Sequence, residues 1–333
     1  MKGPTADGPA DGPADGLGDR LPQFGAAAMA GLLTPAEAAD ALAAALLGGL
    51  DPESSPQRTI VPVPEGELLL MPAASGAYAG VKIAGVAPGN PARGLPRITG
   101  SYLLLDGPTL RPLALFDGAA LTTLRTPAVS ALALRHLAPA GRPLRLVLFG
   151  SGPQAYGHLE ATLAVRELAE VVVVARNPEG ADRLAAHARS LGPAARTGTA
   201  EAVADADLVI CCTTAREPLF DGRLAGPGCT VVAVGSHEPT ARETDTALVR
   251  RSAVYVESRA AALREAGDLL VPEAEGAIGP GHITGTLADL VAGRMPAGGA
   301  QSCPQLFKSV GMAWEDLAVA VALFEATGAR GTT

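Results

Sequence analysis

The chain has 333 residues, and 48% of them are hydrophobic, which is enough to bury a large core and excludes an intrinsically disordered protein. Aspartate and glutamate (34) outnumber lysine and arginine (26), and the net charge of −8 argues against nucleic acid or an anionic membrane as the main partner. No segment has the length and apolarity of a transmembrane helix, and the N-terminus lacks the apolar core of a signal peptide. We therefore expect a cytoplasmic enzyme or binding protein that acts on a small molecule.

The first part of the chain predicts a sheet with few helices. Residues 1–20 repeat Ala-Asp-Gly-Pro with almost nothing apolar, which predicts a disordered tail. Thr34-Pro35-Ala36-Glu37 is a capping box with proline at the first helical position, and it predicts a helix to about Leu47. A second helix is predicted over 121–138, and Pro127 is expected to mark its first turn. The strands predicted between these helices are 67–72, 79–86, 101–106 and 113–116.

The second part of the chain alternates strands with helices. The predicted strands are 144–149, 171–175, 207–212, 230–234, 254–256 and 305–307. This alternation predicts an α/β fold with a doubly wound parallel sheet of the Rossmann type over 139–311. A closing helix over 311–326 is expected to return to the first domain. That domain is then a discontinuous α+β unit of residues 21–138 and 312–333.

A glycine turn follows the first of these strands. The apolar run Leu144–Phe149 leads into Gly150-Ser151-Gly152-Pro153-Gln154-Ala155, and a helical pattern begins at once. In this context Gly-x-Gly-x-x-Ala is typical of dinucleotide binding: the first glycine permits the turn, the second lets a pyrophosphate approach, and the alanine packs the helix on the strand. The alternative is a glycine-rich turn such as any α/β domain contains.

The end of the next strand distinguishes NADPH from NADH. A carboxylate at that place binds a ribose 2′-hydroxyl, whereas an arginine accommodates a 2′-phosphate. The chain has Arg176 and Asn177 there and no acid before Glu179, so we predict NADPH, with NADH as the alternative. Thr213 and Thr214 follow the third strand and are expected to lie over the cofactor.

The cysteines and lysines are few. The cysteines are Cys211, Cys212, Cys229 and Cys303. They lack C-x-x-C spacing and a nearby histidine cluster, so we expect neither a disulfide nor a metal site. The lysines are Lys2, Lys82 and Lys308. Because arginine supplies the other positive charges, the two lysines within the folded part indicate a need for a compact ammonium whose pKa shifts readily; chance is the alternative.

Seven segments carry a family resemblance. They are Leu70–Pro72, Gly80–Ile83, Pro88–Pro91, Leu121–Thr126, Gly150–Ala155, Gly285–Leu290 and Phe307–Gly311. In this order and spacing, from about residue 30 to 326, they resemble the ornithine cyclodeaminase/μ-crystallin family. The resemblance implies a homodimer whose first domain binds substrate and dimerises. It also implies a site between the domains, where Arg58, Lys82 and Arg125 bind the substrate's carboxylate.

The resemblance also implies the positions that bind the cofactor. Lys308 matches the family's segment near the nicotinamide, and its alternative is a surface lysine at a helix start. The predicted cofactor-binding residues are Thr126, Gly150, Gly152, Pro153, Gln154, Ala155, Arg176, Asn177, Thr213, Thr214, Val234, Gly235, Lys308 and Gly311.

Two positions depart from the cyclodeaminases of this family. Those enzymes have a glutamate immediately before Leu-Met-Pro that helps to hold the substrate's distal amine, and here the position is Leu69. They also have an aspartate two residues after the glycine that follows the valine-rich strand. The matching residue here is His237, although Glu238, one residue along, would restore an acid. Without a carboxylate at Leu69 a second ammonium would be buried unpaired, which is costly, so a diamine such as ornithine is disfavoured.

Three hypotheses follow. The first is an NADPH-dependent imine reductase or amino-acid dehydrogenase, in which Lys82 or His237 handles the proton at the imine of an α-imino acid or cyclic ketimine. The second is a cyclodeaminase of ornithine or lysine that uses bound NAD. The third is a non-catalytic NADPH-dependent ligand-binding protein, and the group of three basic residues argues against it.

Overall fold

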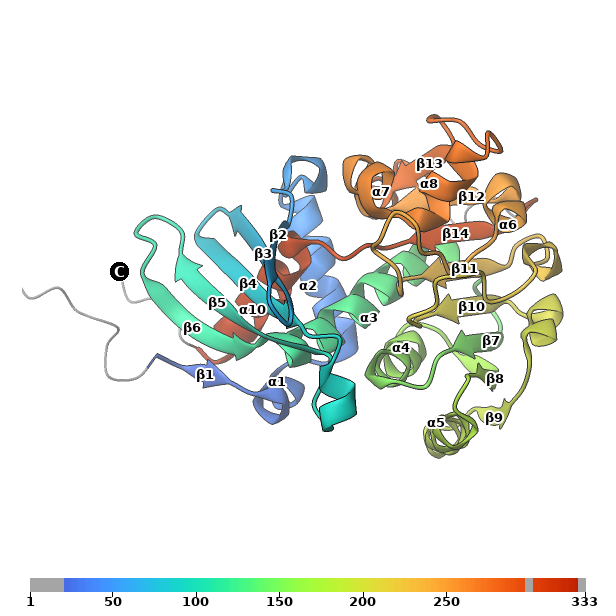
Figure 1. Cartoon of the computed structure of the whole chain (residues 1–333), viewed down its shortest axis with the longest axis horizontal. Coiled ribbons are helices and arrows are strands. Elements are labelled where there is room, and N and C mark those ends of the chain that lie inside the picture. The colour runs from blue at the N-terminus through green and yellow to red at the C-terminus, as the bar shows by residue number, and fades with distance from the viewer. Residues whose placement is uncertain (1–20, 297–301, 329–333) are drawn as a thin grey trace, which may run out of the picture.

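A computed structural model of the chain describes residues 21–296 and 302–328, so the predicted tail 1–20 lies outside the described residues. The elements form two sheets that lie at opposite ends of the molecule, with the long helix α3 (Gly118–Leu137) running from one to the other (Figure 1). The sheet at the left of Figure 1 comes mainly from the first third of the chain. The sheet at the right comes from residues after 143.

The first sheet has six strands in the order β1-β6-β5-β4-β3-β2. They are β1 (Gln23–Phe24), β2 (Thr59–Val63), β3 (Gly66–Ser75), β4 (Tyr78–Val86), β5 (Ile98–Asp106) and β6 (Pro112–Asp117). All neighbours are antiparallel except β1 and β6. In β4, Lys82 and Ala84 are buried while Ile83 between them is exposed, so one face of the sheet is covered and the other faces outward.

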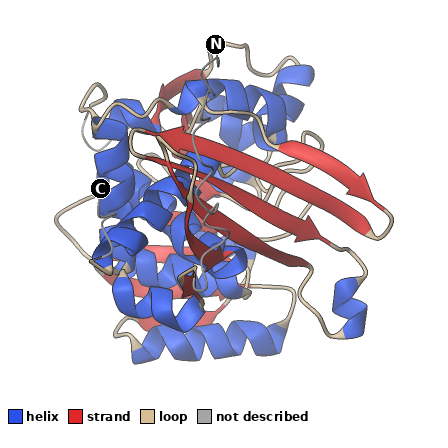
Figure 2. Cartoon of the chain, turned by 90° about the vertical axis from the view of Figure 1, so that its left-hand side faces the viewer, coloured by secondary structure: helices blue, strands red, loops and turns tan. Residues whose placement is uncertain are grey.

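Helices cover the inner face of this sheet (Figure 2). Helices α3 and α10 (Ala313–Ala326) pack on the strands, and α1 (Ala26–Leu32) and α2 (Pro35–Leu47) pack on those two helices. Although α10 is the last helix of the chain, it packs against β3, β4, α2 and α3. Thr34 and Glu37 form the predicted capping box at the start of α2. No single helix of the described residues is long and apolar enough to cross a membrane; α1 and α2 pass only as a pair, and a 77° bend separates them.

The second sheet has eight parallel strands in the order β13-β12-β14-β11-β10-β7-β8-β9. They are β7 (Leu144–Phe149), β8 (Leu168–Val174), β9 (Ala194–Thr197), β10 (Leu208–Cys211), β11 (Thr230–Ala233), β12 (Ala253–Val256), β13 (Ile283–Thr286) and β14 (Gln305–Lys308). The connecting helices are α4 (Pro153–Leu163), α5 (Pro178–Ser190), α6 (Thr246–Arg251), α7 (Arg259–Glu265), α8 (Gly267–Ala274) and α9 (Leu287–Val291). The predicted α/β class with a doubly wound parallel sheet is confirmed.

The expected place of Pro127 is wrong. Helix α3 begins at Gly118, because the Asp117 carboxylate accepts the amides of Ala119 and Ala120 at 2.9 and 3.0 Å. Pro127 therefore lies well inside the helix instead of in its first turn. The proline ring packs on Gly157 of α4, where a Cβ atom would stand 2.8 Å from the proline Cγ.

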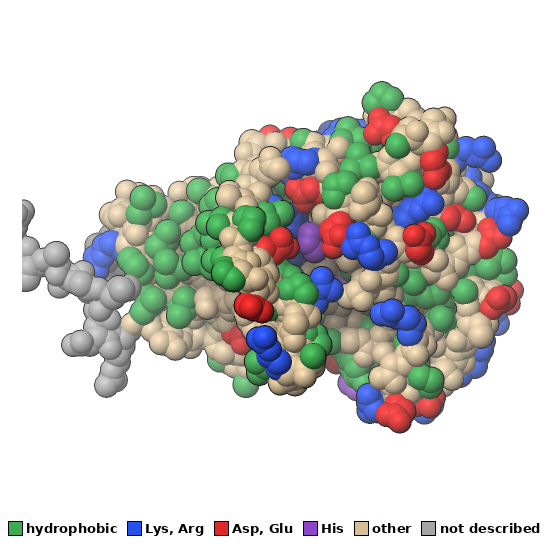
Figure 3. All heavy atoms as spheres, viewed as in Figure 1, with side chains coloured by type: hydrophobic (Ala, Val, Ile, Leu, Met, Phe, Trp, Pro, Cys, Tyr) green, Lys and Arg blue, Asp and Glu red, His purple; other side chains and the backbone are tan. Residues whose placement is uncertain are grey.

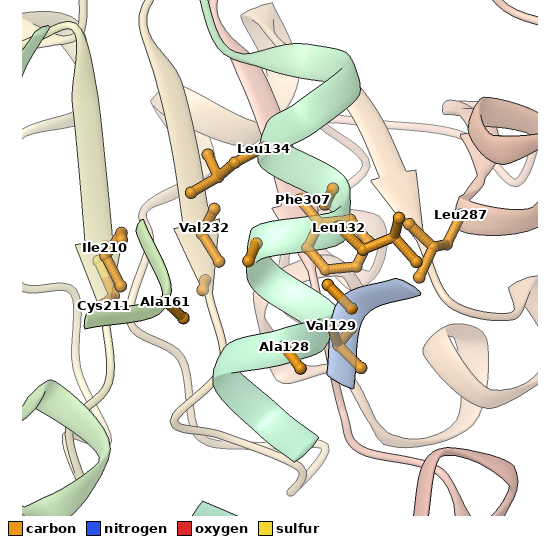
Figure 4. Close-up of a cluster of buried hydrophobic side chains, with 14 of the residues drawn as sticks. Ala128, Val129, Leu132, Leu134, Ala161, Ile210, Cys211, Val232, Leu287 and Phe307 are labelled. Atoms are coloured by element: carbon orange, nitrogen blue, oxygen red, sulfur yellow. The ribbon is translucent and has the colours of Figure 1, made fainter. Parts of the chain in front are cut away.

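The core is continuous between the two sheets. Figure 4 shows Ala128, Val129 and Leu132 of α3 among side chains of the second sheet such as Val232 and Phe307, and all five are buried. Helix α3 thus shares one apolar core with both sheets. Because Arg125 belongs to α3, this packing also fixes Arg125 relative to the strands of the second sheet.

Candidate active site

Lys82 lies in β4 on the covered face of the first sheet, and 3% of it is exposed. Its ammonium nitrogen is 2.9 and 2.7 Å from the two carboxylate oxygens of Asp316 in α10, and it donates to the Thr122 hydroxyl at 3.4 Å. Burial lowers the pKa of Lys82 to about 8, and the Asp316 charge opposes that fall, while the Arg125 charge adds to it. Lys82 is thus a buried lysine whose pKa of about 8 lies well below its usual value of 10.5.

Arg125 of α3 is the second buried cation of the predicted substrate site. Its Nη1 atom donates to Glu315 at 2.6 Å, and its Nε atom lies 3.4 Å from Asp316. Burial, with the nearby Glu257 charge, raises the pKa of Glu315 well above its usual range. Because Asp316 contacts both Arg125 and Lys82, it joins these two cations.

Arg58 approaches the same point from the segment before β2. Its Nη2 atom donates to the carbonyl oxygens of Val310 and Gly311 at 2.9 and 2.6 Å, and it lies 2.9 Å from a carboxylate oxygen of Glu265 in α7. Gly311 has φ +72°, and a Cβ atom there would stand 2.7 Å from the Arg125 Nη1 atom. The structure thus brings the three predicted substrate-binding cations together around Gly311 and Asp316. It also pairs each one with a carboxylate that the sequence analysis did not single out.

Leu69 shares the sheet face of Lys82. In the antiparallel pairing of β3 with β4, Leu69 stands opposite Ala84 and Met71 stands opposite Lys82. Residues that face each other across antiparallel strands project to the same side, so Leu69 is the diagonal neighbour of Lys82. Leu69 is 6% exposed. A small cavity, lined in part by Arg58, Met71 and Met312, lies beside this face.

His237 follows β11 in a loop at the junction of the two sheets. The residue is exposed, yet the protein atoms around its imidazole and the charge of Arg58 lower the pKa of His237 to about 4. The charge of Glu265 acts in the opposite direction and raises the pKa of His237. At neutral pH His237 is therefore an uncharged imidazole within electrostatic reach of Arg58. Glu238, the other acid considered for this position, binds Arg216 at 2.6 Å.

Lys308 is the last residue of β14 and is 1% exposed, so it is not the surface lysine that was the alternative to a place near the nicotinamide. Its ammonium donates to the carbonyl of Ser236 at 2.7 Å and lies 3.0 Å from a carboxylate oxygen of Asp268. The ammonium is therefore enclosed behind the loop that carries His237. Figure 3 shows charged side chains and a histidine gathered where the two parts of the molecule meet.

The glycine turn has the geometry that a pyrophosphate needs. Gly150 has φ +114°, and a Cβ atom there would stand 2.8 Å from the carbonyl oxygen of Cys212, so only glycine fits. A Cβ atom at Gly152 would meet nothing within 4 Å, and Ala155 is completely buried against the strand. No side chain caps α4, whose first residue is Pro153, so the helix N-terminus keeps amides for an anion. These residues fit a dinucleotide cofactor.

The remaining predicted cofactor residues lie at the carboxyl edge of the second sheet or beside it. Arg176 and Asn177 are exposed at the end of β8, and Arg176 has no hydrogen bond or ion pair within residues 21–296 and 302–328. The amides of Thr213 and Gly235 both donate to the buried Glu243 at 2.7 Å, which ties the ends of β10 and β11 together. Thr214 is exposed and Val234 half-buried at these strand ends. Within α3 and α4, Thr126 is buried, and Gln154 donates to the Thr122 carbonyl at 3.4 Å.

Comparisons with known proteins agree with this geometry. A profile of the ornithine cyclodeaminase/mu-crystallin family matches residues 29–330. The chain belongs to this family. The sequence resemblance is thereby confirmed.

Three similar proteins are named as reductases. The chain is 39% identical to the Δ1-pyrroline-2-carboxylate reductase of Colwellia psychrerythraea, covering 69% of this chain and 74% of that protein. It is 36% identical to the ketimine reductase mu-crystallin of Rattus norvegicus, covering 81% and 84%. The solved Thermococcus litoralis Δ1-pyrroline-2-carboxylate reductase, in complex with NADH and L-proline, superposes with a TM-score of 0.86 at 33% identity, covering 92% and 97%. These findings bear out the expectation of an imine reductase that uses a nicotinamide cofactor.

Proposed function

We propose that the chain reduces the C=N bond of an α-imino acid or cyclic ketimine with NADPH. The observation that supports this most strongly is the convergence of Arg58, Lys82 and Arg125 around Gly311 and Asp316. This group lies between the first sheet and the edge of the second sheet where the glycine turn stands. A ligand held there would meet positive charge on one side and a cofactor on the other.

Each of the three cations has its own part in this reaction. The bound cofactor supplies a hydride to the carbon of the C=N bond. Arg58 and Arg125 hold the substrate carboxylate, as their charge and forked donors allow. The Lys82 ammonium gives its proton to the imine nitrogen and becomes a neutral amine. The neutral Lys82 side chain then takes up a proton from water. With a pKa of about 8, Lys82 carries that proton at neutral pH.

Leu69 supports a substrate with no second ammonium. Its buried apolar side chain lies on the same face as Lys82, diagonally across β3 and β4. A diamine would place an ammonium beside it without a counter-charge, at an energetic cost. We therefore favour a substrate that is apolar or uncharged beyond its α-carbon.

Arg176 supports NADPH over NADH. It is exposed at the end of β8 and makes no hydrogen bond or ion pair with the residues that the structure describes. Its guanidinium is thus available to a 2′-phosphate.

A panel of substrates tests the proposal. Purified protein with NADPH is given Δ1-pyrroline-2-carboxylate, its six-membered-ring analogue, and pyruvate with methylamine, and absorbance of the cofactor is followed; the reverse reaction is run with L-proline and NADP⁺. We expect turnover of at least one cyclic ketimine. Ammonia release from ornithine without cofactor consumption would instead favour a cyclodeaminase. Tight NADPH binding without any turnover would favour a binding protein.

The proposal includes a cytoplasmic homodimer and the division into a substrate-binding unit (21–138 and 312–333) and a dinucleotide-binding unit (139–311). The outward face of the first sheet supports the dimer. Strand pairing places Val61, Val63, Leu68 and Ile83 on one face, and each is 36–45% exposed. Figure 3 shows hydrophobic side chains gathered over this sheet. An apolar patch of this kind is typical of a surface that a second copy covers.

A further inference from the structure

Lys308 holds one particular backbone group. Its ammonium donates to the carbonyl oxygen of Ser236 at 2.7 Å, and this carbonyl belongs to the peptide bond that joins Ser236 to His237. The lysine side chain is 0% exposed. A fully enclosed ammonium therefore holds the peptide bond that precedes His237.

Asp268 of α8 holds Lys308 from the other side. One of its oxygens lies 3.0 Å from the lysine nitrogen. The other accepts the amides of Glu243 and Thr244 at 2.9 and 2.8 Å and the Thr244 hydroxyl at 2.8 Å. Asp268 is completely buried, so its contacts are not shared with water. The aspartate thus links Lys308 to the segment that begins at Glu243.

Glu243 completes the arrangement. One carboxylate oxygen accepts the Thr213 amide and hydroxyl, both at 2.7 Å, and the other accepts the Gly235 amide at 2.7 Å. A Cβ atom at Gly235 would stand 2.4 Å from this carboxylate, so the approach requires glycine. The amide of Gly235 and the carbonyl of Ser236 are therefore fixed by two buried side chains, those of Glu243 and Lys308, and His237 comes directly after them.

We propose that Lys308 is a positioning residue that fixes the Ser236 carbonyl from the buried side, and so sets the place of His237 at the domain junction. Lys308, Asp268 and Glu243 form one buried chain that carries this effect. The inference rests on the proposed function and adds to it a part for His237 at the imine. It assigns to Lys308 a part other than direct contact with the nicotinamide.

The choice of lysine agrees with this role. One compact nitrogen reaches a carbonyl and a carboxylate at 2.7 and 3.0 Å inside a site without solvent. A planar guanidinium would need more room and more acceptors. The ammonium also offsets the buried charge of Asp268. Removing the ammonium alone would leave that charge unpaired and destabilise the fold, unless the Asp268 charge is removed too.

Amide hydrogen exchange of the full chain with NADPH tests the positioning directly. In Lys308→Met we expect the segment 234–241 to exchange about tenfold faster or more, while other strand ends of the second sheet keep their rates. The double variant Lys308→Met/Asp268→Asn removes both charges and is expected to show the same local change. Arg216→Met is the matched control, because it removes an exposed cation that binds the neighbouring Glu238 at 2.6 Å. Unchanged exchange in both lysine variants would overturn the inference.

A double-mutant cycle gives a kinetic readout with Δ1-pyrroline-2-carboxylate. We expect Lys308→Met to lower kcat by about 10- to 100-fold, because the reacting groups are misplaced, with a smaller change in KM. In a His237→Gln background the same substitution is expected to lower kcat by less than about twofold, because the residue it positions is gone. Independent, additive losses would overturn the inference. If the parent protein reduces no substrate, the proposed function fails, and hydrogen exchange still decides the role of Lys308.

Discussion

Lys82 and Asp316 form a buried ion pair, with the lysine nitrogen 2.7 Å from one carboxylate oxygen and 2.9 Å from the other. The pair joins β4 to α10, elements separated by more than two hundred residues. Burial lowers the pKa of Lys82 to about 8, and the aspartate charge keeps it from falling further. Asp316 thus helps to decide the pH at which Lys82 carries a proton.

Substitution of Asp316 should move the pH dependence of turnover. If protonated Lys82 supplies the proton, kcat/KM falls as pH rises through about 8. Asp316→Asn removes a charge that raises the pKa of Lys82, so the fall should occur at lower pH. The measurement is a pH profile of NADPH-dependent turnover for both proteins, with unfolding followed in parallel because breaking a buried pair costs about 3–5 kcal/mol. Asp40→Asn, at an exposed pair with Arg135, should leave the profile unchanged. An Asp316→Asn profile equal to the parent's would disprove the coupling.

The two glycines of the turn should respond differently to alanine. At Gly150, φ is +114° and a Cβ atom would stand 2.8 Å from a carbonyl, so Gly150→Ala should destabilise the fold by about 1–3 kcal/mol. At Gly152 a Cβ atom meets nothing within 4 Å, so Gly152→Ala should leave stability unchanged yet weaken NADPH binding at least about tenfold. Thermal unfolding and fluorescence titration with NADPH separate the two effects. Full NADPH affinity in Gly152→Ala would contradict the assignment of the turn.

Arg176 should matter for NADPH and not for NADH. Arg176→Ser removes a cation at the end of β8, and we expect the dissociation constant for NADPH to rise about 10- to 100-fold, because charge-assisted bonds contribute about 1.5–3 kcal/mol each. The affinity for NADH should change by less than about twofold. Arg183→Ser, which removes an arginine that is 65% exposed on α5, is the control. Equal losses for both cofactors would show that Arg176 does not contact a 2′-phosphate.

The outward face of the first sheet should decide the oligomeric state. Ile83→Glu places a charge in the apolar patch, and we expect it to shift the protein from dimer to monomer in sedimentation experiments. Leu191→Glu is a matched control, because Leu191 is 43% exposed, against 45% for Ile83, but lies beside the second sheet. A parent protein that sediments as a monomer would refute the dimer proposal, and so would an Ile83→Glu variant that stays dimeric.

Local sequence patterns predicted most of the fold. Alternating strands and helices identified the parallel sheet, and the glycine turn lies at the end of its strand as expected. The prediction for Pro127 failed, because Asp117 starts α3 earlier than the apolar pattern does. Helices α7 and α8 and strands β9 and β13 were not predicted, since each is short and its pattern is weak.

The cations of the candidate site could be predicted, but their partners could not. Lys82 and Lys308 were conspicuous because lysine is rare in this chain. Their carboxylates, Asp316 and Asp268, come from distant segments, and only the folded chain brings them together. One signal was available for α10: two adjacent acids, Glu315 and Asp316, interrupt an apolar helix, where buried acids require partners.

Transfer of the hydride to the C=N carbon is the central claim, and isotope labelling tests it most directly. The protein is incubated with Δ1-pyrroline-2-carboxylate and NADPH that carries deuterium at the transferred position, and the product is analysed by mass spectrometry. We predict proline with one deuterium at the α-carbon, and at least about a hundredfold less of it in the same time with Lys82→Met. Absence of labelled proline, with the cofactor bound and the protein folded, would contradict the account.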